Sequence, residues 1–156
     1  MGETPQLPFA LIIRPMELAD VDAVLKVEKA SFATPRSREA FVTEVGDNDL
    51  ARYLVAEVDG QIVGYAGMWL ILDEAHITNV ALLPSFRGRG LGSKLMEKLC
   101  ELAKIAGARR MTLEVRPSNL AAQRLYSRMG FEVCGIRPGY YTDSKEDALI
   151  MWRDRL

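Results

Sequence analysis

The segment that most restricts the fold of this chain is Arg87-Gly88-Arg89-Gly90-Leu91-Gly92. An apolar run typical of a β-strand precedes it, and residues with the spacing of an amphipathic helix follow it. Glycine adopts positive φ angles at low cost, so such a loop can turn its backbone N–H groups toward an anion. The helix N-terminus adds partial positive charge, and Arg87 and Arg89 add full charges. The sequence therefore predicts a strand, a diphosphate-binding loop and a helix in succession.

Three interpretations of this glycine loop compete. A nucleoside triphosphate loop requires Gly-Lys-Ser/Thr after four intervening residues, and the sequence lacks it. A dinucleotide loop requires a third glycine three positions after the second, where Ser93 stands, and it leaves its strand directly, whereas Pro84-Ser85-Phe86 intervene here. The third interpretation, a glycine-rich surface turn with exposed arginines, is left open by the loop alone.

The remaining sequence predicts a mixed α/β domain. Asp59-Gly60 lies between two β-rich runs and predicts a tight hairpin. Asp20 and Ser37 are expected to cap two early helices, and Ser118 or Asn119 a later one. Strands are expected at residues 11–14, 53–58, 61–72, 75–82, 110–115, 131–135 and 147–152. The order is a strand, two helices, a three-strand meander, a helix, a strand, a helix and two strands, which predicts a mixed sheet with helices on its faces.

Length and charge limit the class of protein. The 156 residues suit one domain, expected at residues 10–156 behind a loose tail at residues 1–9. A formal net charge of −1 gives no indication of nucleic acid or an acidic membrane as a partner. Cys100 and Cys134 lack metal-ligand spacing, so we expect neither a disulfide framework nor a metal site. Without a signal peptide or a membrane-spanning run, the expectation is a cytoplasmic protein that is a monomer or weak dimer.

Several motifs in one order point to a known family. Arg87, Gly90 and Gly92 form an Arg-x-x-Gly-x-Gly pattern that resembles the acetyl-CoA motif of the GNAT acetyltransferases. The chain also resembles the second half of the family's sequence pattern, at Leu113-Glu114-Val115-Arg116, Asn119, Leu125-Tyr126 and Met129-Gly130-Phe131. More narrowly, the chain resembles the RimI-type ribosomal-protein alanine acetyltransferases through Leu72-Asp73-Glu74-Ala75, Asn119 with Ala121 and Ala122, Arg137-Pro138-Gly139-Tyr140-Tyr141, and Glu146-Asp147-Ala148-Leu149-Ile150-Met151.

The resemblance implies the GNAT fold, a mixed sheet flanked by helices in which two central parallel strands splay apart to admit acetyl-CoA. These strands would be residues 75–82 and 110–115. The expected acetyl-CoA-binding residues are Val80, Ala81 and Leu82 at the thioester arm, Arg87, Gly88, Arg89, Gly90, Leu91, Gly92 and Ser93 at the diphosphate, and Asn119 at the arm. A backbone N–H near residues 80–82 is expected to stabilise the oxyanion.

The family reaction is direct attack of an amine on the thioester, without an enzyme nucleophile. Glu114, a carboxylate in an otherwise apolar strand, is the expected base, acting directly or through a water. The alternative interpretation is that Glu114 faces outward and pairs with Arg116. Tyr126 is the expected donor to the departing thiolate, and its alternative is a core tyrosine with a hydrogen-bonded tip. His76 is expected to pack or form hydrogen bonds rather than to catalyse.

The resemblance also places the acceptor. Phe32 and Pro35, together with Tyr140 and Tyr141, are the expected acceptor-binding residues, although the tyrosines could instead pack between the last two strands. RimI-type sequences often have Pro-Trp-Ser where this chain has Pro35-Arg36-Ser37, and this difference leaves the preferred peptide open.

An α-amino group, with a pKa near 8, loses its proton more easily at neutral pH than a lysine side chain, with a pKa near 10.4. We therefore expect acetyl transfer to a protein N-terminus, and the resemblance implies the alanine of a small-subunit ribosomal protein. The alternatives are a small-molecule amine or a lysine side chain as acceptor, or a CoA-binding module without turnover.

Overall fold

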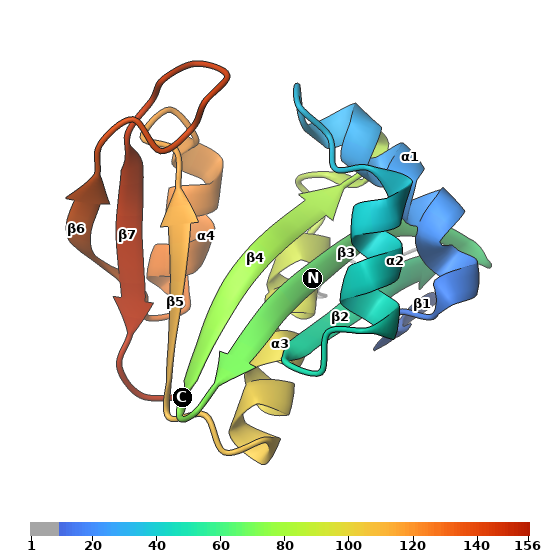
Figure 1. Ribbon diagram of the computed structural model, residues 1–156, viewed down its shortest axis with the longest axis horizontal. Coiled ribbons are helices and arrows are strands. Elements are labelled where there is room, and N and C mark those ends of the chain that lie inside the picture. The colour runs from blue at the N-terminus through green and yellow to red at the C-terminus, as the bar shows by residue number, and fades with distance from the viewer. Residues whose placement is uncertain (1–9) are drawn as a thin grey trace, which may run out of the picture.

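The computed structural model describes residues 10–156, so the expected tail at residues 1–9 lies outside the described residues. Seven strands form one mixed sheet in the order β1-β2-β3-β4-β5-β7-β6 (Figure 1). The strands are β1 (Leu11–Pro15), β2 (Ala51–Val58), β3 (Gln61–Ile71), β4 (Glu74–Leu82), β5 (Arg110–Val115), β6 (Glu132–Arg137) and β7 (Ala148–Arg153). The helices are α1 (Val21–Ser31), α2 (Arg38–Gly46), α3 (Leu91–Ile105) and α4 (Leu120–Arg128), with 3-10 turns at η1 (Leu18–Asp20) and η2 (Pro84–Phe86). The predicted order of elements and the mixed α/β sheet are confirmed.

Two of the predicted local signals form as expected. Asp59 and Gly60 have φ angles of 49° and 83°, the pair of positive values that a tight two-residue hairpin needs between β2 and β3. The hydroxyl of Ser37 accepts a hydrogen bond from the backbone N–H of Ala40 at 3.1 Å and caps α2.

The predicted cap at Asp20 is wrong. Its carboxylate binds the guanidinium of Arg14 at 2.7 and 2.8 Å and accepts a hydrogen bond from the backbone N–H of Glu17 at 2.7 Å. These bonds hold the pKa of Asp20 below its usual value, chiefly through Arg14. Asp20 itself has helical angles because η1 runs directly into α1, and its side chain makes no capping bond to that helix.

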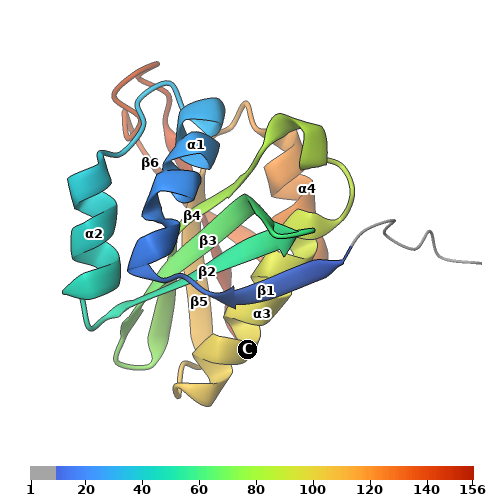
Figure 2. The same cartoon turned by 90° about the vertical axis from the view of Figure 1, so that its right-hand side faces the viewer.

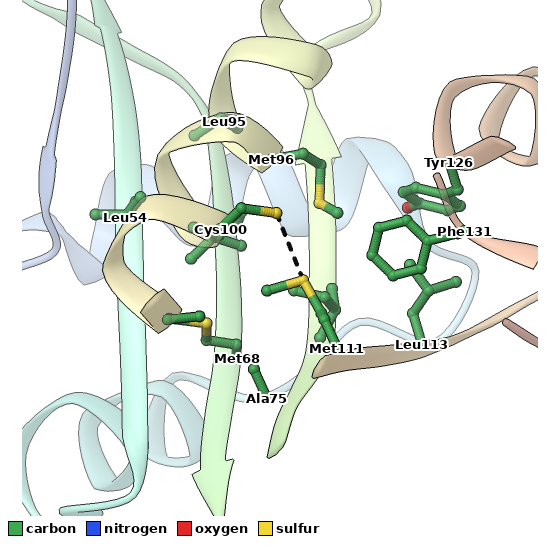
Figure 3. Close-up of a cluster of buried hydrophobic side chains, with 14 of the residues drawn as sticks. Leu54, Met68, Ala75, Leu95, Met96, Cys100, Met111, Leu113, Tyr126 and Phe131 are labelled. Atoms are coloured by element: carbon green, nitrogen blue, oxygen red, sulfur yellow. Dashed lines mark hydrogen bonds between the residues drawn. The ribbon is translucent and has the colours of Figure 1, made fainter. Parts of the chain in front are cut away.

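Helices cover both faces of the sheet. Helices α1 and α2 lie on one face, and α3 and α4 lie on the other (Figure 2). A smaller apolar cluster that includes Val24, Phe41 and Tyr65 fills the α1 side. A larger cluster fills the α3 and α4 side, where Met96 and Tyr126 are among the buried residues (Figure 3). This two-sided core fixes which strand residues face which layer.

The strands β4 and β5 diverge. They are parallel, and their backbone pairing covers only Glu74 with Arg110, Ala75 with Met111, and His76 with Thr112. Beyond these pairs the two strands separate into a V, as Figure 1 shows. On the other side of β4, the pairing with β3 skips Thr78, which forms a bulge. The predicted splay of the two central strands is therefore present, with its vertex at His76.

Candidate active site

A cleft of about 600 Å³ opens between β4 and β5. Residues from both halves of the sheet and from the loops above it line the cleft. Seven residues expected from the sequence to bind or catalyse lie in its wall: Phe32, Val80, Glu114, Asn119, Tyr126, Tyr140 and Tyr141. The cleft therefore brings together both predicted catalytic residues, three of the predicted acceptor residues, and Val80 and Asn119 of the predicted donor residues.

Glu114 and Tyr126 enter the cleft from opposite faces of the sheet. Leu113 and Val115 belong to the apolar cluster on the α3 side, so Glu114 between them points toward the α1 side. Tyr126 belongs to the α3-side cluster and comes from α4. The V between the strands thus connects an acidic group on one face with a phenol on the other.

The carboxylate of Glu114 has a partner on the opposite arm of the V. Its Oε2 lies 2.6 Å from Nε2 of His76, and its Oε1 lies 3.9 Å from the guanidinium of Arg137. The Glu114 side chain is only 8% exposed, whereas that of His76 is 33% exposed. His76 therefore connects a buried carboxylate with the open cleft, which agrees with its expected hydrogen-bonding role.

The alternative that Glu114 pairs with Arg116 is wrong. Arg116 binds Asp143 through both carboxylate oxygens at 2.9 and 3.0 Å and approaches Glu146 at 3.4 Å. Its guanidinium also lies 4.0 Å from the ring centroid of Tyr141. Alternation along β5 places Glu114 and Arg116 on the same face of the sheet. The hydrogen-bond acceptors for Arg116, however, come from the acidic loop that follows β6.

Tyr126 is a buried phenol at the side of the cleft. Its ring packs 5.9 Å from that of Phe131 (Figure 3). Its hydroxyl forms no hydrogen bond with a side chain or backbone group of residues 10–156. Burial raises the pKa of Tyr126 to about 12. The group is therefore a hydrogen-bond donor that stays neutral over the whole physiological range.

The glycine loop has the backbone expected of a diphosphate site. Gly88 and Gly90 have φ angles of 75° and 81°, and no other group lies within 4 Å of the position that a Cβ would take at either residue. Gly90 precedes α3, whose first turn leaves backbone N–H groups without intrahelical acceptors. At Gly92 a Cβ would lie 3.5 Å from Leu125, so a side chain there would enter the space between α3 and α4. These features fit the diphosphate of CoA.

Other predicted donor-site residues lie around this loop rather than in the wall of the cleft. Arg87 donates to the carbonyl of Leu82 at 3.0 Å and to the hydroxyl of Ser31 at 3.2 Å, so its side chain links the loop to α1. Arg89 is exposed, with its guanidinium 5.8 Å from the ring centroid of Phe86. Outside the cleft wall are Ala81, Leu82, Arg87, Gly88, Arg89, Gly90, Leu91, Gly92 and Ser93.

At the end of β5, the side chain of Asn119 accepts a hydrogen bond from the backbone N–H of Ala122 at 3.1 Å and caps α4. Asn119 therefore fixes the helix that carries Tyr126 and also lines the cleft.

The acceptor side of the cleft is walled by two tyrosines. The rings of Tyr140 and Tyr141 meet edge to face at 5.0 Å, and both line the cleft. Phe32 lines the same cleft from the end of α1, while Pro35 is exposed and lies outside the wall. The two tyrosines thus line the opening instead of filling the space between β6 and β7.

Several residues in the cleft wall had no predicted role in binding or catalysis, among them His76, Asn79 and Trp69. The side-chain oxygen of Asn79 is shielded from solvent and has no hydrogen-bond partner among residues 10–156. Trp69 donates from Nε1 to Glu44 at 2.8 Å. No local sequence pattern marks these residues, since His76 stands at the vertex of the splay and Asn79 follows the bulge at Thr78.

Two further features concern residues 10–156 only. No group of three or more His, Cys, Asp or Glu side chains is placed to hold a metal ion. None of the helices in this range is long and apolar enough to cross a membrane.

Comparison with known proteins gives consistent results. Residues 21–131 match the model of the acetyltransferase (GNAT) family. A Bacillus subtilis protein, assigned provisionally as a [ribosomal protein bS18]-alanine N-acetyltransferase, is 48% identical over 140 residues, which are 90% of this chain and 93% of that protein. The [ribosomal protein bS18]-alanine N-acetyltransferase of Escherichia coli K12 is 36% identical over 143 residues, 89% of this chain and 94% of the relative. The crystal structure of the Escherichia coli ribosomal-protein-S18-alanine N-acetyltransferase matches with a TM-score of 0.84 at 33% identity, over 92% of each chain.

Proposed function

This chain belongs to the GNAT acetyltransferase family, an acetyl-CoA-dependent group of N-acetyltransferases, and from that premise we propose that it acetylates the N-terminal alanine of ribosomal protein bS18. The observation that carries the proposal is the pairing of Glu114 with His76 on the side of the cleft walled by Tyr140 and Tyr141. A proton acceptor there faces the space in which a peptide end fits. The proposed acceptor places the enzyme in the cytoplasm, where we expect it to act as a monomer or weak dimer.

Acetyl-CoA supplies the acetyl group as an activated thioester. The backbone N–H groups from Gly88 to Ser93 would hold its diphosphate, since the loop fits an anion and the helix end favours negative charge. Backbone groups of Val80, Ala81 and Leu82 would hold the arm along the splayed edge of β4, with Asn119 opposite. Arg87 would keep the loop against the end of β4 through its bond to the Leu82 carbonyl.

Glu114 would take the proton from the incoming ammonium, directly or through a water. His76 lies within hydrogen-bond distance of the carboxylate and is open to the cleft, so it can orient that carboxylate and pass the proton outward. An α-amino group with a pKa near 8 is easier to deprotonate at neutral pH than a lysine side chain with a pKa near 10.4, which favours a protein N-terminus as acceptor.

Tyr126 would donate a hydrogen bond to the sulfur that leaves. Its pKa of about 12 lies well above that of a free thiol near 8.5, so complete proton transfer from the phenol is uphill. A neutral donor that stabilises charge on sulfur without losing its proton is the role that fits this pKa. We therefore assign Tyr126 to hydrogen bonding, with the proton of the released thiol supplied by solvent.

The test is acetyl transfer to a peptide with the N-terminal sequence of bS18, followed by mass mapping. We expect one acetyl group, on the α-amine. A matched peptide with a blocked N-terminus and an internal lysine should stay unmodified. Modification of the blocked peptide would favour a lysine acceptor, and transfer only to small amines would favour a small-molecule acceptor. Tight CoA binding with no acetyl transfer to any amine would indicate that the protein is a CoA-binding module without turnover.

A further inference from the structure

A second cavity of about 550 Å³ lies beside the active-site cleft, against α2. Its wall is formed by Arg36, Ser37, Glu39, Ala40, Thr43, Glu44 and Trp69. Arg36 and Trp69 also line the cleft, so these two side chains stand where the two spaces meet. An acceptor chain that places its amino end at Glu114 can continue past this junction toward α2.

Arg36 is held firmly at this junction. Its backbone N–H donates to the buried carboxylate of Glu28 at 2.8 Å, and its Nη1 donates to the hydroxyl of Tyr53 at 2.8 Å. The guanidinium also lies 5.7 Å from the ring centroid of Phe41. A side chain fixed in this way is already ordered before a ligand arrives, which lowers the entropy cost of binding.

The guanidinium has unused donors. Arginine offers five N–H groups, and within residues 10–156 this one donates a single side-chain hydrogen bond, to the neutral hydroxyl of Tyr53. No carboxylate of that range forms a salt bridge with it within 4 Å. The remaining nitrogen atoms are not shielded from solvent, so these donors are available to a ligand that enters the junction.

The charges nearby indicate which oxygen acceptor suits Arg36. Glu28 contributes a carboxylate on the cleft side, and Glu44 contributes another on the α2 side. Glu44 is stabilised as an anion by bonds from Trp69, Asn48 and Tyr53, and its pKa is lowered. A third carboxylate would be repelled by these two, whereas a main-chain carbonyl accepts hydrogen bonds without adding charge.

We propose that Arg36 is an acceptor-binding residue that donates hydrogen bonds to a main-chain carbonyl of the acceptor peptide beyond its first residue. The inference rests on the proposed peptide acetylation. It adds a site that binds the acceptor peptide through its backbone, independently of the peptide's side chains. It predicts that the enzyme recognises peptide length through Arg36.

The experiment compares alaninamide with Ala-Ala, Ala-Ala-Ala and Ala-Ala-Ala-Ala amides, using kcat/KM for acetylation. In the unmodified protein we expect kcat/KM to rise with length by about 10- to 100-fold, the range for a hydrogen bond to a charged group. Arg36→Gln should remove most of this gain, measured as the ratio of kcat/KM for the tetrapeptide amide to kcat/KM for alaninamide within the same variant. Arg36→Lys should recover only part of the gain, because it keeps the charge and loses the planar fork.

The matched control is Arg38→Gln, because Arg38 is an exposed neighbour that pairs with Asp22 outside both cavities. It should keep the full gain with length. Thermal unfolding of each variant separates loss of binding from loss of folding, since a purely structural Arg36 would change stability and leave the length dependence intact.

Two results would overturn the inference. One is an unchanged length dependence in Arg36→Gln, and the other is a gain that appears only when an acidic residue is placed at position two or three, which would identify a carboxylate as the ligand. In either case acetylation of the tetrapeptide by the unmodified protein would leave the proposed function standing. Absence of acetylation of every peptide would instead remove the proposed function.

Discussion

Nε2 of His76 lies 2.6 Å from Oε2 of Glu114, across the point where β4 and β5 part. His76 is the last residue of β4 paired with β5, and Glu114 stands two residues beyond its partner Thr112. The contact therefore depends on the splay, which brings both side chains to one face of the sheet just above the vertex. The contact with His76 orients the buried carboxylate of Glu114 and connects it, through the imidazole, with solvent.

This relationship predicts the effect of changing His76. His76→Phe removes the hydrogen bond to the carboxylate, and we expect kcat to fall about 10-fold or more, because hydrogen bonds to charged groups contribute about 1.5–3 kcal/mol. His76→Gln keeps a donor and should retain more activity. The KM for acetyl-CoA should be unchanged in both variants. Equal kcat for His76→Phe and the unmodified enzyme would contradict a positioning role.

Replacing Gly90 tests the diphosphate site. Gly90→Ala forces a Cβ onto a residue with a φ angle of 81°, which should lower the free energy of unfolding by about 1 kcal/mol and weaken CoA binding about 10-fold. Gly60 is a matched control, since it has a φ angle of 83° in the hairpin and open space around it. Gly60→Ala should cost similar stability and leave the calorimetric Kd for CoA unchanged. Equal Kd values in the two variants would remove the loop from the binding site.

The raised pKa of Tyr126 has a consequence for stability at high pH. Between about pH 10 and 12 the unfolded chain ionises this tyrosine while the folded protein keeps it neutral, so the free energy of unfolding should fall as pH rises. The shift of about two units corresponds to about 2.7 kcal/mol. Tyr126→Phe should lose less stability over this interval in denaturant titrations. Identical pH slopes would show that burial does not perturb the phenol.

Changing Arg116 tests the acceptor wall. Arg116 gathers Asp143, Ser144 and Glu146 and packs on the ring of Tyr141. Lysine cannot use two nitrogens at once, as Arg116 does with Nη2 on Asp143 and Nη1 on Ser144 and Glu146, and it cannot stack on the ring. For Arg116→Lys, KM for the peptide should therefore rise about 10-fold with little change in KM for acetyl-CoA.

Arg110→Lys is the control for this change, because Arg110 also pairs with a carboxylate, Glu74, and lies over a ring, Trp152, but outside the cleft. Its peptide KM should stay within about twofold of the unmodified enzyme. A rise in peptide KM for both variants would indicate general loosening of the sheet.

Much of the fold could be read from local chemistry. Asp59-Gly60 and Ser37 act through contacts within three residues, so the sequence contains all that is needed to predict them. Asp20 misled the prediction because its partner Arg14 comes from β1, and an ion pair with another element outweighs a local capping bond. The glycine loop could be identified from its sequence because Gly88 and Gly90 adopt positive φ angles that few other residues take.

The site was less predictable where strands depart from regular pairing. His76 and Glu114 are 38 residues apart, and their contact follows from the end of pairing at the vertex. Asn79 owes its orientation to the bulge at Thr78. Arg36 could be identified as a departure from the family pattern, but its bond to Tyr53 and its free donors depend on where α1 and α2 place the loop between them.

The most direct test is single-turnover acetyl transfer by Glu114→Gln to an Ala-starting peptide, with the calorimetric Kd for acetyl-CoA measured on the same sample. Since the amide cannot accept the proton, we expect transfer to slow by about 10²- to 10⁴-fold while the Kd stays within about twofold. Transfer at the rate of the unmodified enzyme, with acetyl-CoA bound equally well, would contradict the assignment of Glu114 as the base.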